Sequence, residues 1–158
     1  MLAEAAEHDL GALMTSAAHA GRLGGRGVIN LWIREQGPDW EVSTELQHSN
    51  LAILMAYKLR ANWGGDLNLV TAVDDADQLQ QADHYLHGLA ELARLPGPPG
   101  VHVLNTSFFA ALPTAPFADL SLFALSPDVD FAALRRIIDA ADTPCAFVRD
   151  SGEESAFI

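Results

Sequence analysis

The sequence predicts an α/β fold, a three-layer Rossmann-like arrangement around one mainly parallel sheet of five strands. Two observations lead to this prediction. Short apolar runs of strand character recur along the chain, and a segment with helical spacing separates most neighbouring runs. This alternation is typical of parallel strands that are joined by helical crossovers. The five predicted strands are residues 28–33, 67–73, 101–105, 120–125 and 145–148.

The amino-terminal part of the chain is expected to form two segments ahead of this core. Residues 1–20 place apolar side chains at helical spacing and predict an N-terminal helix. Residues 21–27 are rich in glycine and predict a linker, because a phosphate-binding glycine loop has to follow a strand and precede a helix. We therefore expect one domain over residues 1–158, with its α/β core at residues 28–158.

The remaining segments of the core are assigned from their apolar patterns. Residues 51–60 are apolar almost all round, which predicts a helix that is buried on more than one side. In the long acidic connection over residues 34–49, Trp40 is expected to cover an apolar edge of the core. After a turn at Gly152, residues 155–158 are expected to form a short antiparallel edge strand. Further helical segments are predicted at residues 77–94, 108–112 and 130–141.

Composition and charge exclude several classes of partner. The formal charge is −12, from 9 basic and 21 acidic residues. Nucleic acid and anionic lipid both attract basic surfaces, so neither is expected to bind. The longest apolar run, residues 51–57, is far shorter than the roughly 20 residues of a membrane span, so no direct membrane insertion by this chain is expected. The single cysteine, Cys145, lies in a predicted strand and is interpreted as a core residue in a reducing compartment.

Two groups of residues suggest metal binding and one serine suggests catalysis, but none of them predicts a site. The first group, Asp83, His84, His87 and Glu91, shares one helix face and lacks a ligand from elsewhere, which is more typical of a solvated surface. The second group, Asp74, Asp75 and Asp77, follows the second strand, lacks the later residues of a calcium loop and suits the start of a helix. Ser107 has no evident base, and no nucleophile-elbow motif occurs.

Glu35 and Asp128 are the acids that we expect at the point where the strand order reverses. Parallel α/β sheets bind ligands at the carboxyl ends of their strands near this point. Two carboxylates there could perform acid–base chemistry, or they could simply repel a phosphate. Because the sequence offers neither a nucleophile nor a cofactor loop, it predicts no catalytic residue, no metal and no cofactor, and it assigns no cofactor-binding residue.

The order of predicted strands and helices is that of the universal stress protein-like fold, whose strands run 3-2-1-4-5. More specifically, the chain resembles the second half of the cytosolic C-terminal domain of cation–chloride cotransporters, in the amino acid–polyamine–organocation transporter superfamily. The resemblance covers nearly the whole chain and rests on patterns of apolar residues. The stretches that carry it are residues 28–33, 51–59, 67–73, 119–125, 131–138 and 146–149.

This resemblance implies a non-catalytic regulatory domain beneath a membrane transporter. It implies a homodimer, attached to a transmembrane domain of the same or a partner polypeptide, in the cytoplasm at the inner face of the cell membrane. Nucleotide-binding members of the fold carry G-x-x-G…G-[ST] after the fourth strand, whereas residues 126–131 (SPDVDF) contain no glycine. The alternative is a free-standing protein of the universal stress protein type that binds a nucleotide or small ligand; an acidic hydrolase or transferase is the third interpretation.

Overall fold

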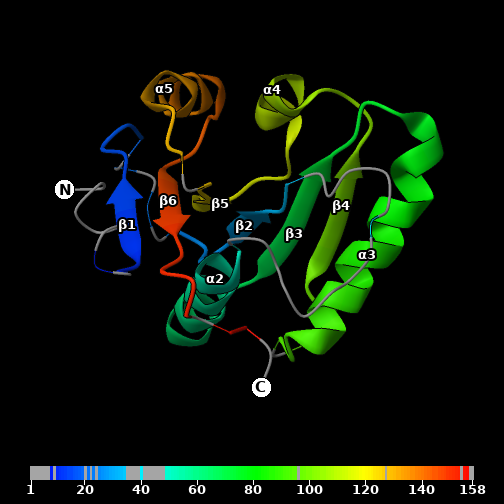
Figure 1. Cartoon of the computed structure of the whole chain (residues 1–158), viewed down its shortest axis with the longest axis horizontal. Helices are drawn as coiled ribbons and strands as arrows, with labels where there is room; N and C mark the ends of the chain where they lie inside the picture. Colours follow the sequence, from blue (N-terminus) through cyan, green and yellow to red (C-terminus); the bar gives the residue numbers. More distant parts are fainter. Residues whose placement is uncertain are drawn as a thin grey trace.

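The computed structural model describes residues 8, 10–19, 21, 23, 25–34, 40, 49–95, 97–126, 128–153 and 155–156. They form one sheet with helices on both faces (Figure 1). The strands are β1 (Ala12–Thr15), β2 (Ile29–Trp32), β3 (Leu67–Ala72), β4 (Gly100–Leu104), β5 (Leu120–Ala124) and β6 (Cys145–Arg149). The helices are α2 (Asn50–Trp63), α3 (Leu79–Leu92), α4 (Phe108–Ala111) and α5 (Phe131–Ala140), with the short 3-10 helices η2 (Ala76–Gln78) and η3 (Leu112–Thr114).

The strand order confirms the predicted topology. The sheet runs β1-β6-β5-β2-β3-β4, and without β1 this is the order 3-2-1-4-5. The central strand β2 pairs in parallel with both β3 and β5, so that Leu31 lies opposite Leu69 on one side and Leu122 on the other. From β2 the chain first adds β3 and β4 on one side of the sheet, and it then crosses over to add β5 and β6 on the other side. The carboxyl ends of β2 and β5 therefore mark the point where the order reverses.

The prediction of a helix over residues 1–20 is wrong for residues 12–15. These residues form β1, which pairs antiparallel with β6 from Ala12 opposite Arg149 to Thr15 opposite Ala146. Helical spacing of apolar residues is a weak local signal, and hydrogen bonding to the otherwise open edge of β6 overrides it. Residues 1–7, 9 and 20 lie outside the described residues.

The antiparallel edge strand exists, but it comes from the opposite end of the chain to the one predicted. The edge position beside β6 is occupied by β1. Ser155 and Ala156 are not part of a strand; instead the Ala156 amide donates a hydrogen bond to Asn50 Oδ1, 2.9 Å away, at the start of α2. This hydrogen bond ties the C-terminal tail to the start of α2. The rest of the predicted strand, residues 157 and 158, lies outside the described residues.

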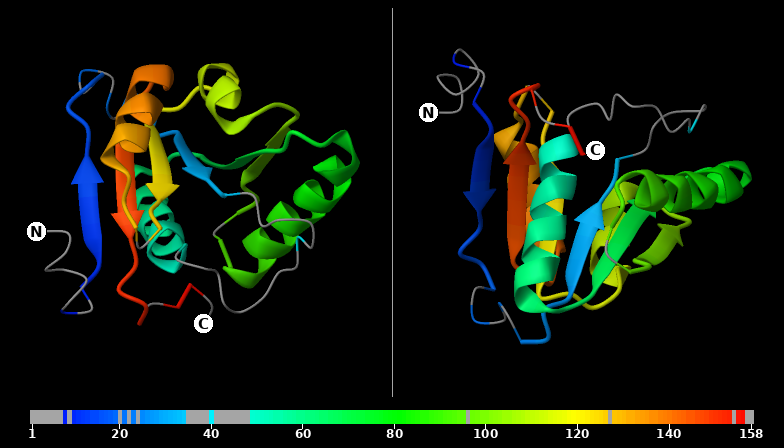
Figure 2. Two further views of the ribbon diagram at one scale, coloured as in Figure 1. Left: turned by 45° about the horizontal axis from the view of Figure 1, so that its top comes forward. Right: turned by 90° about the horizontal axis from the view of Figure 1, so that it is seen from below.

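The hydrophobic core has two parts, one on each face of the sheet. The first lies under α2 and α3, where Ile29, Leu31 and Leu69 meet Ile53 and Leu86. The second lies under α4 and α5, where the aromatic side chains of Trp32, Phe123 and Phe147 pack among aliphatic ones. Figure 2 shows the two pairs of helices on opposite faces of the sheet. Because parallel strands are covered on both faces, β2 is buried at all four positions.

Trp40 lies at the edge of the first core part, as predicted. Its indole is 6% exposed, meets the Tyr85 ring edge-on at 5.5 Å between centroids, and donates a hydrogen bond to Gln78 Oε1 at 2.9 Å. Trp40, from the connection between β2 and α2, thus packs against α3 near its start. The other residues of that connection between 35 and 48 lie outside the described residues.

A buried carboxylate fixes the entry of the chain into β2. Asp119, immediately before β5, is 2% exposed and accepts hydrogen bonds from the backbone amides of Arg26 and Val28, both at 2.9 Å. Desolvation alone would raise the pKa of Asp119, but hydrogen bonds from Val28, Arg26, Gly25 and Gly27 together lower it below its ordinary value of 3.8. The glycine-rich segment that was predicted as a linker thus also donates backbone hydrogen bonds to this carboxylate.

In the part of the chain that the structure describes, none of the helices has the length and apolar character needed to cross a membrane.

Asp119→Asn is expected to destabilise the protein by about 1–3 kcal/mol at neutral pH, because it removes a charged acceptor and turns an amide group toward backbone N–H donors. Since the pKa of Asp119 is lowered on folding, its contribution is complete above the unfolded pKa and is lost as pH falls through the lower folded pKa. Urea unfolding from pH 7 to pH 2.5 measures it. The difference in unfolding free energy between the two proteins should be constant above about pH 5 and shrink below pH 4; a constant difference down to pH 2.5 would contradict this account.

Candidate functional site

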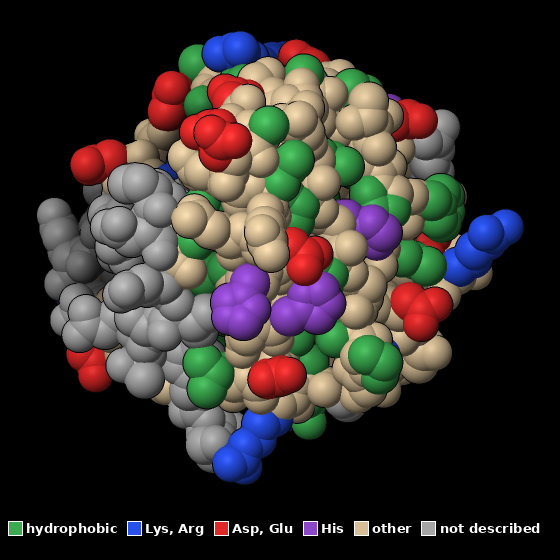
Figure 3. All heavy atoms as spheres, turned by 90° about the vertical axis from the view of Figure 1, so that its right-hand side faces the viewer, with side chains coloured by type: hydrophobic (Ala, Val, Ile, Leu, Met, Phe, Trp, Pro, Cys, Tyr) green, Lys and Arg blue, Asp and Glu red, His purple; other side chains and the backbone are tan. Residues whose placement is uncertain are grey.

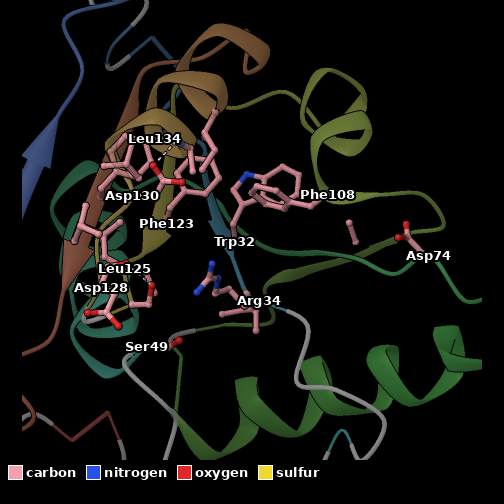
Figure 4. A pocket seen from close by; sticks show the side chains of 18 residues that line it. Trp32, Arg34, Ser49, Asp74, Phe108, Phe123, Leu125, Asp128, Asp130 and Leu134 are labelled. Carbon is pink, nitrogen blue, oxygen red and sulfur yellow. Dashed lines mark hydrogen bonds between the residues drawn. The ribbon is translucent and has the colours of Figure 1, made fainter.

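A cavity of about 660 Å³ opens at the point where the strand order reverses. Its walls come from the carboxyl ends of β2, β3 and β5, from β6, and from the first turns of α4 and α5 (Figure 4). Ligand sites in proteins span roughly 300–1,000 Å³, and parallel sheets place them at this edge. The position and volume make this cavity the candidate site.

Aromatic side chains form the inner wall of the cavity. The Trp32 indole of β2 stacks on Phe123 of β5 with centroids 5.8 Å apart, and Phe108 of α4 meets Trp32 edge-on at 5.6 Å. Phe147 of β6 extends the stack beyond Phe123 at 5.3 Å. These residues lie on the face of the sheet that packs against α4 and α5. The wall is therefore apolar and rigid, because each ring is held by its neighbours.

The Trp32 indole nitrogen is an exception in this apolar wall. The side chain is 3% exposed, and its Nε1 is buried without a hydrogen-bond acceptor among the residues that the structure describes. A buried donor without a partner costs stability and is rare in folded proteins. Figure 4 shows this nitrogen on the edge of the indole that is turned toward Leu134 and Asp130 of α5.

The mouth of the cavity carries more acid than base. Arg34 reaches into the cavity from the end of β2, with Asp128 on one side and Asp74 on the far side (Figure 4). Asp130 also lines the cavity and caps α5, where its carboxylate accepts hydrogen bonds from the amides of Ala132 at 2.9 Å and Ala133 at 3.3 Å. The sequence analysis placed Asp128 here correctly. Glu35, the other predicted acid, lies outside the described residues.

The amino end of α2 is closed by a carboxylate from the far end of the chain. Asp150, just after β6, is 7% exposed and accepts hydrogen bonds from the backbone amides of Asn50 at 2.9 Å and Leu51 at 3.0 Å. In a parallel α/β fold the first helix after the first strand is the usual place for a phosphate, because its free amides and dipole attract anions. Here a carboxylate of the chain itself already takes those donors.

In the described part of the chain, two sets of backbone donors at the carboxyl edge of the sheet are thus occupied from within. Asp150 takes the start of α2 and Asp130 the start of α5, whereas Asp119 takes the amides that lead into β2 at the opposite, amino edge. A phosphate brought to any of these positions would have to displace a carboxylate and meet its repulsion. The arrangement disfavours binding of a nucleotide through its phosphates.

The histidines and acids of α3 remain on the surface (Figure 3). His84 and His87 are exposed, and His87 Nδ1 lies 3.4 Å from the Asp83 carboxylate one turn earlier. In the described part of the chain, no group of three or more histidine, cysteine or acidic side chains could hold a metal ion. Among the acids after β3, Asp75 accepts a hydrogen bond from the amide of Asp77 at 2.9 Å and caps η2, as the helix-start interpretation predicted.

Cys145 is a core residue, as predicted. It is 1% exposed at the start of β6, and its Sγ lies 3.4 Å from the Thr143 carbonyl oxygen. Burial raises the pKa of the Cys145 thiol to about 12, and an interaction with the Thr143 side chain, which lowers it, opposes this only in part. The thiol therefore stays protonated at neutral pH and is a poor nucleophile.

The fold and the crevice define an acidic parallel-sheet domain. In this domain, carboxylates of the chain itself accept the hydrogen bonds that amides at helix starts would otherwise donate to a bound anion. The model of one protein family, the second part of the C-terminal domain of prokaryotic cation-chloride cotransporters, matches residues 24–157, and the chain belongs to this family. The resemblance inferred from the apolar patterns is thereby confirmed.

A solved structure agrees with this assignment. The cytoplasmic domain of a prokaryotic cation chloride cotransporter is 38% identical and superimposes with a TM-score of 0.86. The match covers 98% of the present chain and 58% of the other, so the chain spans little more than half of that domain. Among curated proteins, none matches the chain.

Asp150→Asn is expected to lower the free energy of unfolding by about 1 kcal/mol, the usual loss when a helix cap is weakened. The amides of Asn50 and Leu51 should also exchange with solvent faster, because their charged acceptor is gone. Urea unfolding and amide hydrogen exchange measure the two effects.

Asp66→Asn is the matched control, since Asp66 is exposed between α2 and β3 and the substitution removes the same unit of charge. Equal effects of the two substitutions would mean that net charge, rather than the cap, determines the loss.

Proposed function

We propose that the chain, residues 1–158, acts as one non-catalytic cytosolic regulatory domain of a membrane transporter of the cation–chloride cotransporter type. The family match over residues 24–157 is the observation that carries this proposal. The crevice supports it, because the backbone donors at the starts of α2 and α5, which a nucleotide-binding relative would offer to phosphates, are held by Asp150 and Asp130. We assign no catalytic residue, metal or cofactor to this role.

The transporter role gives the domain a place in the cytoplasm, at the inner face of the cell membrane. A transmembrane domain of the same or a partner polypeptide would hold it there. The charge of −12 suits this place, because cytoplasmic loops of membrane proteins are rich in lysine and arginine, whereas anionic lipid head groups repel an acidic domain. Contact would thus be with protein rather than with the bilayer.

The regulatory role includes dimerisation through α2. The inner side of this helix is buried at Ala52, Ile53 and Ala56. Its other apolar side chains, among them Leu54 and Tyr57, are only half-buried. Stable homodimers commonly join such apolar surfaces. The helix predicted over residues 1–20 would be another apolar surface for dimerisation, but residues 12–15 form β1, so α2 is the proposed interface.

Tyr57→Asp is expected to shift the protein from dimer to monomer, because it places a charge in the apolar interface, while the circular dichroism spectrum stays unchanged. Analytical ultracentrifugation at 5–200 µM measures the dissociation constant. An increase of tenfold or more is expected.

Phe131→Asp is the control, because Phe131 is 64% exposed on α5, on the opposite face of the sheet. A wild-type protein that stays monomeric at 200 µM would overturn the proposed dimerisation, and loss of the dimer in both variants would remove α2 as the interface.

A further inference from the structure

The cavity at the carboxyl edge of the sheet has no part in the proposed transporter role. Its volume, about 660 Å³, would accommodate a small organic molecule. It combines an aromatic inner wall from β2, β5, β6 and α4 with a charged mouth, whose residues lie in the connections that follow β2, β3 and β5. What such a cavity binds is decided by its charge and its hydrogen-bonding groups.

We propose that this cavity binds a small organic cation: a protonated amine on an apolar, aromatic-sized body that also carries a hydrogen-bond acceptor. The proposal rests on three independent features of the cavity, namely the charge of its mouth, the aromatic wall and the unpartnered indole N–H.

The charge of the mouth selects for a cation. Among the described residues, three carboxylates, those of Asp74, Asp128 and Asp130, line the cavity against one guanidinium, that of Arg34. The Asp130 carboxylate also caps α5. The net charge of the whole chain has the same sign, at −12, so the field of the protein raises the local concentration of cations and lowers that of anions.

The aromatic wall selects for an apolar body. Trp32, Phe108 and Phe123 contact one another in stacked and edge-on pairs and present apolar surface to the cavity. Burial of apolar area provides about 25 cal/mol per Å², so a ring-sized body contributes more to affinity than a small inorganic ion could. Aromatic rings also attract a positive charge that lies close to them.

The indole N–H of Trp32 selects for an acceptor on that body. The nitrogen is turned toward the α5 side of the cavity and is buried without a partner in the described structure (Figure 4). A hydroxyl or carbonyl oxygen at that depth would satisfy it and remove the penalty of an unpaired buried donor. The ammonium group would then lie outward, near Asp128.

Three probes of one shape and different charge test the proposal: tyramine as the cation, tyrosol as the neutral analogue and 4-hydroxyphenylacetate as the anion. Isothermal titration calorimetry and two-dimensional amide spectra in 150 mM KCl would measure the affinities and locate the binding site. Tyramine is expected to bind saturably, at least tenfold more tightly than the anion, and to shift the amides of Arg34, Phe123 and Asp128.

Substitutions separate the cavity from the general negative charge of the protein. Asp128→Asn is expected to weaken tyramine binding at least threefold, whereas Asp66→Asn, which removes one unit of charge far from the cavity, should leave it unchanged. Trp32→Phe should weaken binding while it preserves the aromatic wall and the circular dichroism spectrum.

Three results would overturn the proposal: absence of saturable tyramine binding up to 10 mM, equal affinity for tyramine and 4-hydroxyphenylacetate, or equal losses from Asp128→Asn and Asp66→Asn. The transporter-domain assignment does not depend on any of them, because it rests on the family match.

Discussion

Hydrogen bonds from backbone amides to carboxylates of the same chain hold this fold together at both edges of its sheet. Asp119 reaches back 91 residues to the amide of Val28, and Asp150 reaches back 100 residues to that of Asn50. Each bond joins a strand end to the start of another element. The central strand β2 is thus fixed at its entry, and α2 is fixed at its first turn. Without these acceptors the amides would be left without charged partners in partly buried positions.

The same bonds shape what the crevice can bind. In related topologies, free amides at helix starts and glycine-rich turns form anion sites, because several N–H groups converge on one point. In this chain Asp150 and Asp130 satisfy the amides at the starts of α2 and α5, and the cavity beside them retains an aromatic wall and an acidic mouth. Although this fold commonly binds phosphates, the cavity in this chain therefore favours apolar and cationic groups.

The sequence predicted the parallel core well because strong, local signals mark it. Each of the five core strands was found, since apolar runs such as residues 67–73 are buried on both faces and need no long-range information. The amino-terminal segment was predicted wrongly because residues 12–15 become a strand only where the edge of β6 is available. Edge pairing depends on tertiary context, which a periodic pattern of apolar residues does not contain.

The candidate site was predicted only in part, for the same reason. Asp128 was placed from its position after a predicted strand, whereas Arg34, Trp32 and Asp74 were not assigned to the crevice. Asp119 and Asp150 each stand directly beside a strand, one before β5 and one after β6, which is the only local signal of their role. Their partners lie 91 to 100 residues away, beyond the reach of any motif in the sequence. Long-range side-chain-to-backbone bonds of this kind become visible only in three dimensions.

Titration of the wild-type protein with magnesium ATP tests the central claim most directly, because ATP offers the phosphates that free amides would bind. Calorimetry together with amide spectra should show no saturable heat up to 5 mM and no shift of the amides of Asn50, Leu51, Ala132 and Ala133. Saturable binding in the micromolar range with shifts at those amides would mean that phosphate displaces the carboxylates, and would contradict the account.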